Sequence, residues 1–344
     1  MRRSRLSRRV VGVVEEQKQV KKRVYIALPE KDEEFLVEYR EQVRAFADVD
    51  QNPEDRRPTD EEKMAAATSA DILMVGRTGG GLTREIIDAA RDLSAVGVVG
   101  GAVRMAEPEY VLEKRIRLFN AGWAMAESVA EFTVAMMLCG LRDIPHMIDV
   151  LDREGWGRAR KPLDLGGRRV GLVGFGGIGR RVAELLAPFR CDIVACDPHA
   201  DFTGSSVRQV ELGELLAHSE VVSIHAGMTD ESRGMLGKAE LATLADNTLI
   251  VNTARAGIID ENAIVAELQA RRLRAALNVF WKEPLADDHP LRELDNVILT
   301  PHGGGLTHDR RVRQSQSLVE DIRRVCEGQR PTHEVTLEML GRMT

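Results

Sequence analysis

A glycine-rich turn near the middle of the chain constrains the fold more than any other feature. Residues 169–173 form a short apolar run of strand type, and the sequence GFGGIG (174–179) follows at once. The segment 178–189 then has the apolar spacing of a helix. Glycines between a strand and a helix allow a tight turn and a close approach of the backbone to a pyrophosphate. The motif predicts a dinucleotide site with contacts at Gly174, Gly176, Gly177, Ile178 and Gly179.

An acidic residue at a suitable distance supports this interpretation. Asp197 lies 18 residues beyond Gly179, at the end of the strand expected over 191–196. A carboxylate in this place accepts hydrogen bonds from a ribose 2′-hydroxyl and repels a 2′-phosphate, which favours NAD over NADP. The alternative is an ordinary glycine turn beside a surface aspartate, because the glycine pattern alone is common.

Strand-type runs alternate with helical segments along most of the chain, which is typical of parallel sheets. Together with a length of 344 residues, this predicts an α/β protein with two Rossmann-like, doubly wound parallel-sheet domains. Thr83 is a plausible N-cap of one early helix. The strands are expected over 24–28, 71–76, 93–101, 169–174, 191–196, 220–225, 248–252, 274–279 and 296–300, with helices over 178–189, 212–218, 238–245 and 261–271.

Two longer segments also have helical spacing. One covers 124–151, where Pro145 should kink or end the helix. The other runs from His308 to about Gly328 and is expected to pack back on the first half of the chain. The first nine residues carry five arginines, and residues 1–22 are interpreted as a disordered basic arm.

Composition excludes several classes of protein. Lys and Arg number 48 against 54 Asp and Glu, so the net charge of −6 disfavours general nucleic-acid binding. No apolar run approaches the roughly 20 residues that span a bilayer, and no membrane association is expected. The four cysteines form no CxxC pair, which suits a reducing, cytoplasmic location. The His and Cys positions have no metal-ligand spacing, and no GxSxG nucleophile motif occurs.

Three candidate catalytic residues follow strands downstream of the glycine turn. Arg255, Glu283 and His302 lie within NTARAGIID (252–260), ALNVFWKEPL (276–285) and ILTPHGGG (298–305). The carboxyl ends of parallel strands line the binding crevice of an open α/β sheet, so the three side chains can converge there. Arginine suits a carboxylate or carbonyl oxygen, histidine can donate a proton, and a neighbouring glutamate would favour the imidazolium. This set suits reduction of a 2-oxo acid by NADH.

Each of these residues also has a simpler interpretation. An isolated Arg, Glu or His is more often a surface or interface residue than a catalyst. His225 ends another strand near the crevice, and it is interpreted either as structural or as a residue that contacts the catalytic residues without touching the substrate.

The order of these motifs resembles that of the D-isomer-specific 2-hydroxyacid dehydrogenases, over roughly residues 70–325. That family includes phosphoglycerate, hydroxypyruvate, D-lactate and formate dehydrogenases. The resemblance implies an NAD domain over 123–302 inserted into a substrate domain made from 23–122 and 303–344. It also implies a homodimer formed through the NAD domain, because such enzymes commonly dimerise beside the segment FNAGWAMAESVAE (119–131).

Carried over to this sequence, the resemblance implies catalytic roles for Arg255, Glu283 and His302. Substrate contacts are implied at Val99, Gly100, Gly101 and Arg255, and further cofactor contacts at Asp197, Ala254 and Asn278. Several positions depart from the family pattern. Asn278 stands where Asp is usual beside the nicotinamide carboxamide, and Trp281 replaces a residue that is usually small or polar. Arg104, near the carboxylate loop, either favours a second negative charge on the substrate or is solvated outside it.

The sequence thus predicts an NAD-dependent oxidoreductase that acts on a small 2-oxo or 2-hydroxy acid (the D-isomer), with histidine as proton donor and acceptor. The alternative is an NAD-sensing scaffold, since the family also contains corepressors that use this fold to bind partners. Formate dehydrogenase is a weaker option, because formate oxidation needs no proton relay of the kind that Glu283 and His302 would supply.

Overall fold

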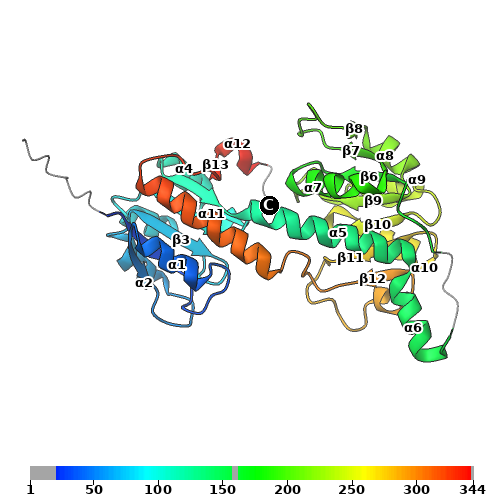
Figure 1. Ribbon diagram of the computed structural model, residues 1–344, viewed down its shortest axis with the longest axis horizontal. Helices are drawn as coiled ribbons and strands as arrows, with labels where there is room; N and C mark the ends of the chain where they lie inside the picture. The colour runs from blue at the N-terminus through cyan, green and yellow to red at the C-terminus, as the bar shows by residue number, and fades with distance from the viewer. Residues whose placement is uncertain (1–20, 157–161, 342–344) are drawn as a thin grey trace, which may run out of the picture.

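Two β-sheets, one parallel throughout and one parallel except for a single edge strand, lie side by side and are joined by long helices (Figure 1). The computed structural model describes residues 21–156 and 162–341. The basic arm expected over residues 1–22 therefore lies outside the described residues, except for Lys21 and Lys22. The α/β class predicted from the sequence is confirmed, with one six-stranded and one seven-stranded sheet.

The first sheet has the strand order β13-β5-β4-β3-β1-β2, and all neighbours are parallel except β13 and β5. Its central strands β3 and β4 are buried along their whole length, because helices cover both faces. The strands are β1 (Arg23–Ile26), β2 (Asp48–Gln51), β3 (Ile72–Gly76), β4 (Ala95–Val99), β5 (Arg117–Asn120) and β13 (Glu334–Val335). The short helices are α1 (Val37–Arg44), α2 (Asp60–Ala67), α3 (Arg84–Ala89), α4 (Pro108–Glu113) and α12 (Leu337–Leu340). Thr83 is the N-cap of α3, as predicted.

The second sheet is parallel throughout, with the order β12-β11-β10-β9-β6-β7-β8. Each strand expected from the sequence is present within two residues of its predicted ends, and the two-residue β8 adds an edge. The strands are β6 (Arg169–Val173), β7 (Asp192–Cys196), β8 (Arg208–Gln209), β9 (Val221–Ile224), β10 (Leu249–Asn252), β11 (Arg274–Leu277) and β12 (Val297–Leu299). Helices α7 (Gly177–Leu186), α8 (Leu212–His218), α9 (Lys238–Thr243) and α10 (Glu261–Gln269) connect them. The strand order reverses between β6 and β9, which places a ligand crevice at their carboxyl ends.

The predicted helix over 124–151 is two helices, α5 (Met125–Arg142) and α6 (Ile144–Glu154). The break is at Asp143, which has a left-handed φ of 57°, rather than at Pro145. Pro145 instead lies in the first turn of α6, where the N–H that proline lacks would have no helical partner.

Helix α5 qualifies the expectation that no apolar run approaches membrane length. The segment Gly122–Arg142 is long and apolar enough to cross a membrane by length and composition alone. Half of it is buried, and α5 contacts α7, β10 and β11 (Figure 1). A core helix that covers a buried sheet has the same composition, so this contact accounts for its apolar character.

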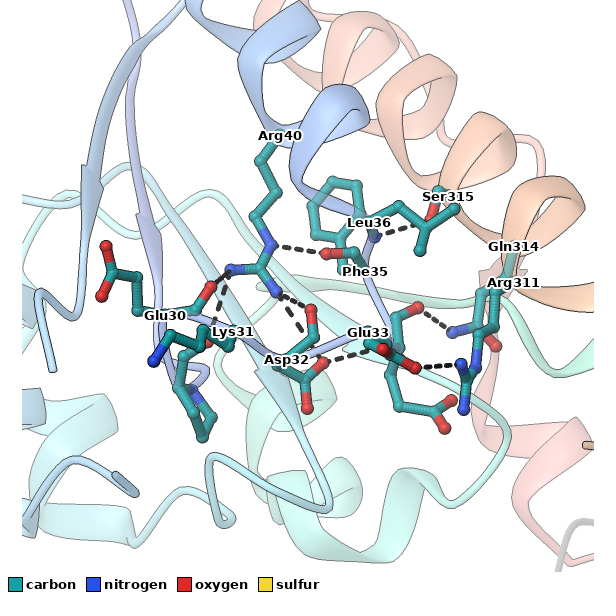
Figure 2. Close-up of polar contacts among 12 residues, drawn as sticks. Glu30, Lys31, Asp32, Glu33, Phe35, Leu36, Arg40, Arg311, Gln314 and Ser315 are labelled. Carbon is teal, nitrogen blue, oxygen red and sulfur yellow. Dashed lines mark hydrogen bonds and ion pairs between the residues drawn. The ribbon is translucent and has the colours of Figure 1, made fainter. Parts of the chain in front are cut away.

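Helix α11 (His308–Cys326) packs on the first sheet, as the sequence predicted. Its residues Leu318 and Ile322 join Val24 and Phe119 in one apolar cluster. The loop between β1 and α1 is fastened to the same helix (Figure 2): Leu36 N donates to Ser315 Oγ over 3.0 Å, and Glu33 and Glu34 contact α11 arginines.

The buried guanidinium of Arg40 organises that loop from within. It donates hydrogen bonds to the backbone carbonyls of Pro29, Glu30, Asp32 and Phe35 (Figure 2). A buried charge is tolerated when its hydrogen-bonding capacity is met in this way. The loop at the carboxyl end of β1 therefore has a fixed shape, and it holds α11 against the first sheet. Helix α11 begins six residues after His302.

Candidate active site at the carboxyl edge of the second sheet

The glycine turn after β6 depends on two close backbone approaches. Gly174 has a φ of +97°, and a Cβ built there would lie 2.4 Å from the backbone nitrogen of Ala226, which follows β9. A Cβ at Gly179 would lie 2.4 Å from the carbonyl oxygen of Gly174. Any larger residue would push α7 away from β6 and β9, so these two glycines have a packing role.

The other two glycines of the turn face open space. A Cβ built at Gly176 or at Gly177 meets no atom within 4 Å. Gly176 is the N-cap of the ten-residue helix α7, whose first amides and positive dipole end point out of the turn. This cradle fits a pyrophosphate, because glycine leaves room for the anion at the helix terminus.

Asp197 is fixed beside the turn at the end of β7. Its Oδ2 accepts the N–H of Phe175 over 2.8 Å, and its Oδ1 accepts the N–H of His199 over 2.9 Å. The side chain is partly exposed, and each oxygen keeps a second lone pair. The carboxylate is therefore oriented by the backbone and can still accept a hydrogen bond from a ribose hydroxyl.

Glu283 and His302 are in direct contact. Glu283 Oε2 lies 2.8 Å from His302 Nδ1, and Glu283 Oε1 accepts the N–H of Phe280 over 3.0 Å. Both side chains are partly exposed, at 38% for Glu283 and 50% for His302. The contact orients the imidazole and leaves Nε2 as the nitrogen that can meet a substrate.

The charge on Glu283 is stabilised by its neighbours. Partial burial opposes ionisation, but the hydrogen bonds from His302 and from the Phe280 N–H, with the charges of His302 and Arg255, outweigh it and lower the pKa of Glu283. The carboxylate therefore stays ionised at neutral pH, in contact with the imidazole of His302.

Arg255 follows β10 in a loop that is held by Asn252. The Asn252 side chain donates to the Arg255 carbonyl and accepts the Ala254 N–H, each over 3.0 Å. The Arg255 side chain is exposed, and its Nη1 donates to the carbonyl of Ala254 over 2.8 Å. Its charge is the smallest of the causes that lower the pKa of Glu283, so Arg255 lies near enough to that carboxylate to act on it electrostatically. Asn252 is not among the residues predicted from the sequence, although a polar residue that ends a buried strand (LIVN) was a usable signal.

Asn278 is buried and supports the loop that carries His302. Its Nδ2 donates to Thr300 Oγ1 over 3.0 Å, and its Oδ1 accepts the N–H of Gly304 over 3.2 Å. These two partners flank His302 on either side. The contact with a nicotinamide carboxamide that the resemblance implies stays a prediction, as does a cofactor contact at Ala254.

The predicted carboxylate loop follows β4, whose last residue is Val99. Gly100 has a φ of +100° and open space where a Cβ would stand, and Gly101 packs closely against Gly122. Arg104 is exposed and pairs with Glu109 over 2.6 Å. Of the two interpretations of Arg104, the structure favours a solvated surface pair.

His225 lies under the glycine turn, with its Cβ within 3.7 Å of the Cβ position of Gly179. Its Nε2 contacts Ser223 Oγ over 2.9 Å, whereas its Nδ1 is buried without a hydrogen-bond partner. Burial lowers the pKa of His225 to about 3. The ring is therefore neutral in the folded protein, which suits the structural interpretation given to it from the sequence.

No group of three or more His, Cys, Asp or Glu residues with the geometry of a metal site is found in residues 21–156 and 162–341. The four cysteines are all unpaired.

The two classes of glycine predict opposite outcomes for the same substitution. Gly174→Ala should lower the free energy of unfolding by at least about 2 kcal/mol, because it combines a clash with a left-handed backbone. Gly176→Ala should lower that free energy by no more than about 1 kcal/mol, the cost of a poorer N-cap, yet weaken NADH binding by roughly tenfold or more by filling the cradle. Chemical unfolding and NADH fluorescence titration measure the two effects. Wild-type NADH affinity in Gly176→Ala would contradict the assignment of the cradle.

The neutral His225 predicts a pH dependence of folding. Between its ordinary pKa of 6.5 and the lowered value of about 3, the unfolded chain takes up a proton that the folded chain excludes. Stability should therefore fall as the pH decreases through this window, with a slope of at most about 1.4 kcal/mol per pH unit. His225→Asn should flatten the curve of unfolding free energy against pH, measured by urea denaturation, whereas His218→Asn at an exposed site should not. An unchanged slope in His225→Asn would show that another group is responsible.

Comparison with known proteins identifies the family of the chain. The model of the D-isomer-specific 2-hydroxyacid dehydrogenase NAD-binding domain matches residues 134–304. The chain is 35% identical to a hydroxypyruvate reductase from Thermotoga maritima over 266 residues, which cover 76% of this chain and 87% of the relative. It is also 35% identical to a D-3-phosphoglycerate dehydrogenase from Methanocaldococcus jannaschii over 296 residues, which cover 83% of this chain but only 56% of that longer protein.

A solved structure agrees with these relatives. A 2-hydroxyacid dehydrogenase from Ketogulonicigenium vulgare superposes with a TM-score of 0.76 at 25% identity, covering 93% of this chain and 99% of the other. With its NAD-binding domain and two-sheet architecture, this chain belongs to the D-isomer-specific 2-hydroxyacid dehydrogenase family.

Proposed function

We propose that the protein transfers hydride between NAD(H) and a small 2-oxo or 2-hydroxy acid of the D series, with His302 as the proton donor in reduction. The contact between Glu283 and His302 beside Arg255, at the sheet edge that also holds the glycine turn, carries this proposal. The names of two relatives support it: one is a hydroxypyruvate reductase and one is a D-3-phosphoglycerate dehydrogenase.

The residues of the chain divide the work of reduction between them. NADH, when bound, supplies the hydride that adds to the carbonyl carbon. His302 donates a proton from Nε2 to the carbonyl oxygen, so that one 2-oxo acid, one hydride and one proton give one 2-hydroxy acid. Glu283 stabilises the imidazolium before transfer, and Arg255 binds the substrate carboxylate or carbonyl oxygen. The amides around Gly100 and Gly101 would hold the carboxylate.

The domain roles follow from this assignment. We infer that residues 123–302 form the NAD domain, and that 23–122 and 303–344 form the substrate domain, because α5 packs on the second sheet and α11 on the first. A cytoplasmic location is proposed from the four unpaired cysteines. The scaffold alternative is not favoured, since the relatives described above have enzyme names.

The proposed chemistry is tested with His302→Gln. We expect purified wild-type protein to oxidise NADH when given glyoxylate, hydroxypyruvate or another 2-oxo acid, followed by NADH absorbance. The variant should lose about 10²- to 10⁴-fold in kcat, while its Kd for NADH stays at the wild-type value, because only proton transfer is removed. His218→Gln, at an exposed position on α8, is the matched control and should keep full activity. Wild-type turnover in His302→Gln would show that another group supplies the proton.

We also propose a homodimer formed through the second domain. Helix α6 projects from that domain (Figure 1), and Ile148, Leu151 and the following Trp156 are 57%, 56% and 98% exposed. An exposed apolar patch of this kind commonly marks an association surface. Sedimentation velocity should show a dimer that Ile148→Glu combined with Leu151→Glu converts to monomer, whereas a wild-type monomer would contradict the proposal.

A further inference from the structure

Trp281 connects two catalytic loops that come from different strands. It lies in the turn that follows β11, two residues before Glu283. Its indole Nε1 donates a hydrogen bond to the carbonyl oxygen of Ile259 over 2.9 Å. The ring is partly buried against the apolar cluster that contains Ile258 and Ile259. The indole is therefore held at both its ring face and its N–H.

Ile259 belongs to the short segment that carries Arg255. This segment continues through a 3₁₀ turn over Ala256–Ile258 and reaches α10. Its far side is tied to the chain before α9, where the Gly257 carbonyl accepts from Gly234 N over 2.8 Å and the Ile258 carbonyl from Leu236 N over 3.1 Å. On the side of the Glu283 turn, the indole N–H supplies the hydrogen bond to the segment.

The other end of the connection is the turn that orients Glu283. Phe280 N donates to Glu283 Oε1, and Glu283 Oε2 contacts His302 Nδ1. Trp281 lies between Phe280 and Glu283 in this turn, so a shift of the indole moves the carboxylate that orients the imidazole. A continuous path thus runs from the Arg255 segment through Trp281 to the catalytic pair.

We propose that Trp281 is a positioning residue for the reaction: its indole N–H fixes the Arg255 segment relative to Glu283 and His302. This inference depends on the proposed function, and Trp281 itself donates nothing to the reacting atoms. Hydride and proton must be delivered to adjacent atoms of one carbonyl group, so a small change in the distance between the cation and the imidazole lowers the rate.

The first test is Trp281→Phe, which keeps an aromatic ring in the apolar cluster and removes the N–H donor. We expect kcat for reduction of a 2-oxo acid to fall roughly tenfold to a hundredfold and KM for that acid to rise, while the Kd for NADH stays at the wild-type value. His218→Gln, at the exposed position on α8, is the control and should keep wild-type kcat and KM. A purely structural tryptophan would alter unfolding stability without this separation of kcat from NADH affinity.

Two outcomes would overturn the inference. One is wild-type kcat and KM in Trp281→Phe. The other is a loss of activity matched by an equal loss of NADH binding, which would indicate general unfolding. If Trp281→Phe does not fold, benzothienylalanine at position 281 replaces N–H by sulfur in a ring of nearly the same shape, and it should show the same fall in kcat. Wild-type protein that turns over no 2-oxo acid would instead contradict the proposed function itself.

Discussion

The contact between Glu283 and His302 forms only if two separate loops at the edge of the second sheet are each held in place. It joins the loop after β11 to the loop after β12, and each loop needs a support of its own. The Phe280 N–H and the Trp281 indole hold the first loop, and Asn278 holds the second through Thr300 and Gly304. Because the imidazole is held through Nδ1, Nε2, the proton donor of the proposed reaction, is presented in one orientation.

The cofactor cradle and the catalytic pair are built at the same sheet edge by different means. At the glycine turn, the absence of side chains allows the backbone of β6 to approach β9 and α7 closely, and it leaves open space at the N-terminus of α7. At the catalytic loops, specific side chains make the supporting hydrogen bonds. His225 follows β9 next to the glycine turn, and burial keeps its ring neutral by lowering its pKa to about 3.

Around the first sheet, the loop after β1 is held by a buried guanidinium that donates to backbone carbonyls. Arg40 is fully buried and donates to four backbone carbonyls, which gives the loop after β1 a defined shape. That loop in turn binds α11, the helix that continues from the His302 segment (Figure 2). The proposed substrate loop at Gly100 and Gly101 follows β4 of the same sheet, which α11 contacts.

The sequence by itself determined the second sheet and the glycine turn, because buried parallel strands and phosphate-binding turns have local patterns, and the catalytic roles of Arg255, Glu283 and His302 stay predictions. Strand β2, with the polar sequence DVDQ, and the two-residue strands β8 and β13 escaped prediction, since edge strands need no apolar run. Strand β5 (RLFN), which lies between β4 and β13, was also missed, because its apolar run is only two residues long. The tertiary structure decided three features: the helix break at Asp143, the hydrogen bond that buried Asn278 accepts from Gly304, and the hydrogen bond from Trp281 to Ile259. In the last two cases the donor and acceptor are more than twenty residues apart, and only the folded arrangement of separate loops brings them within reach.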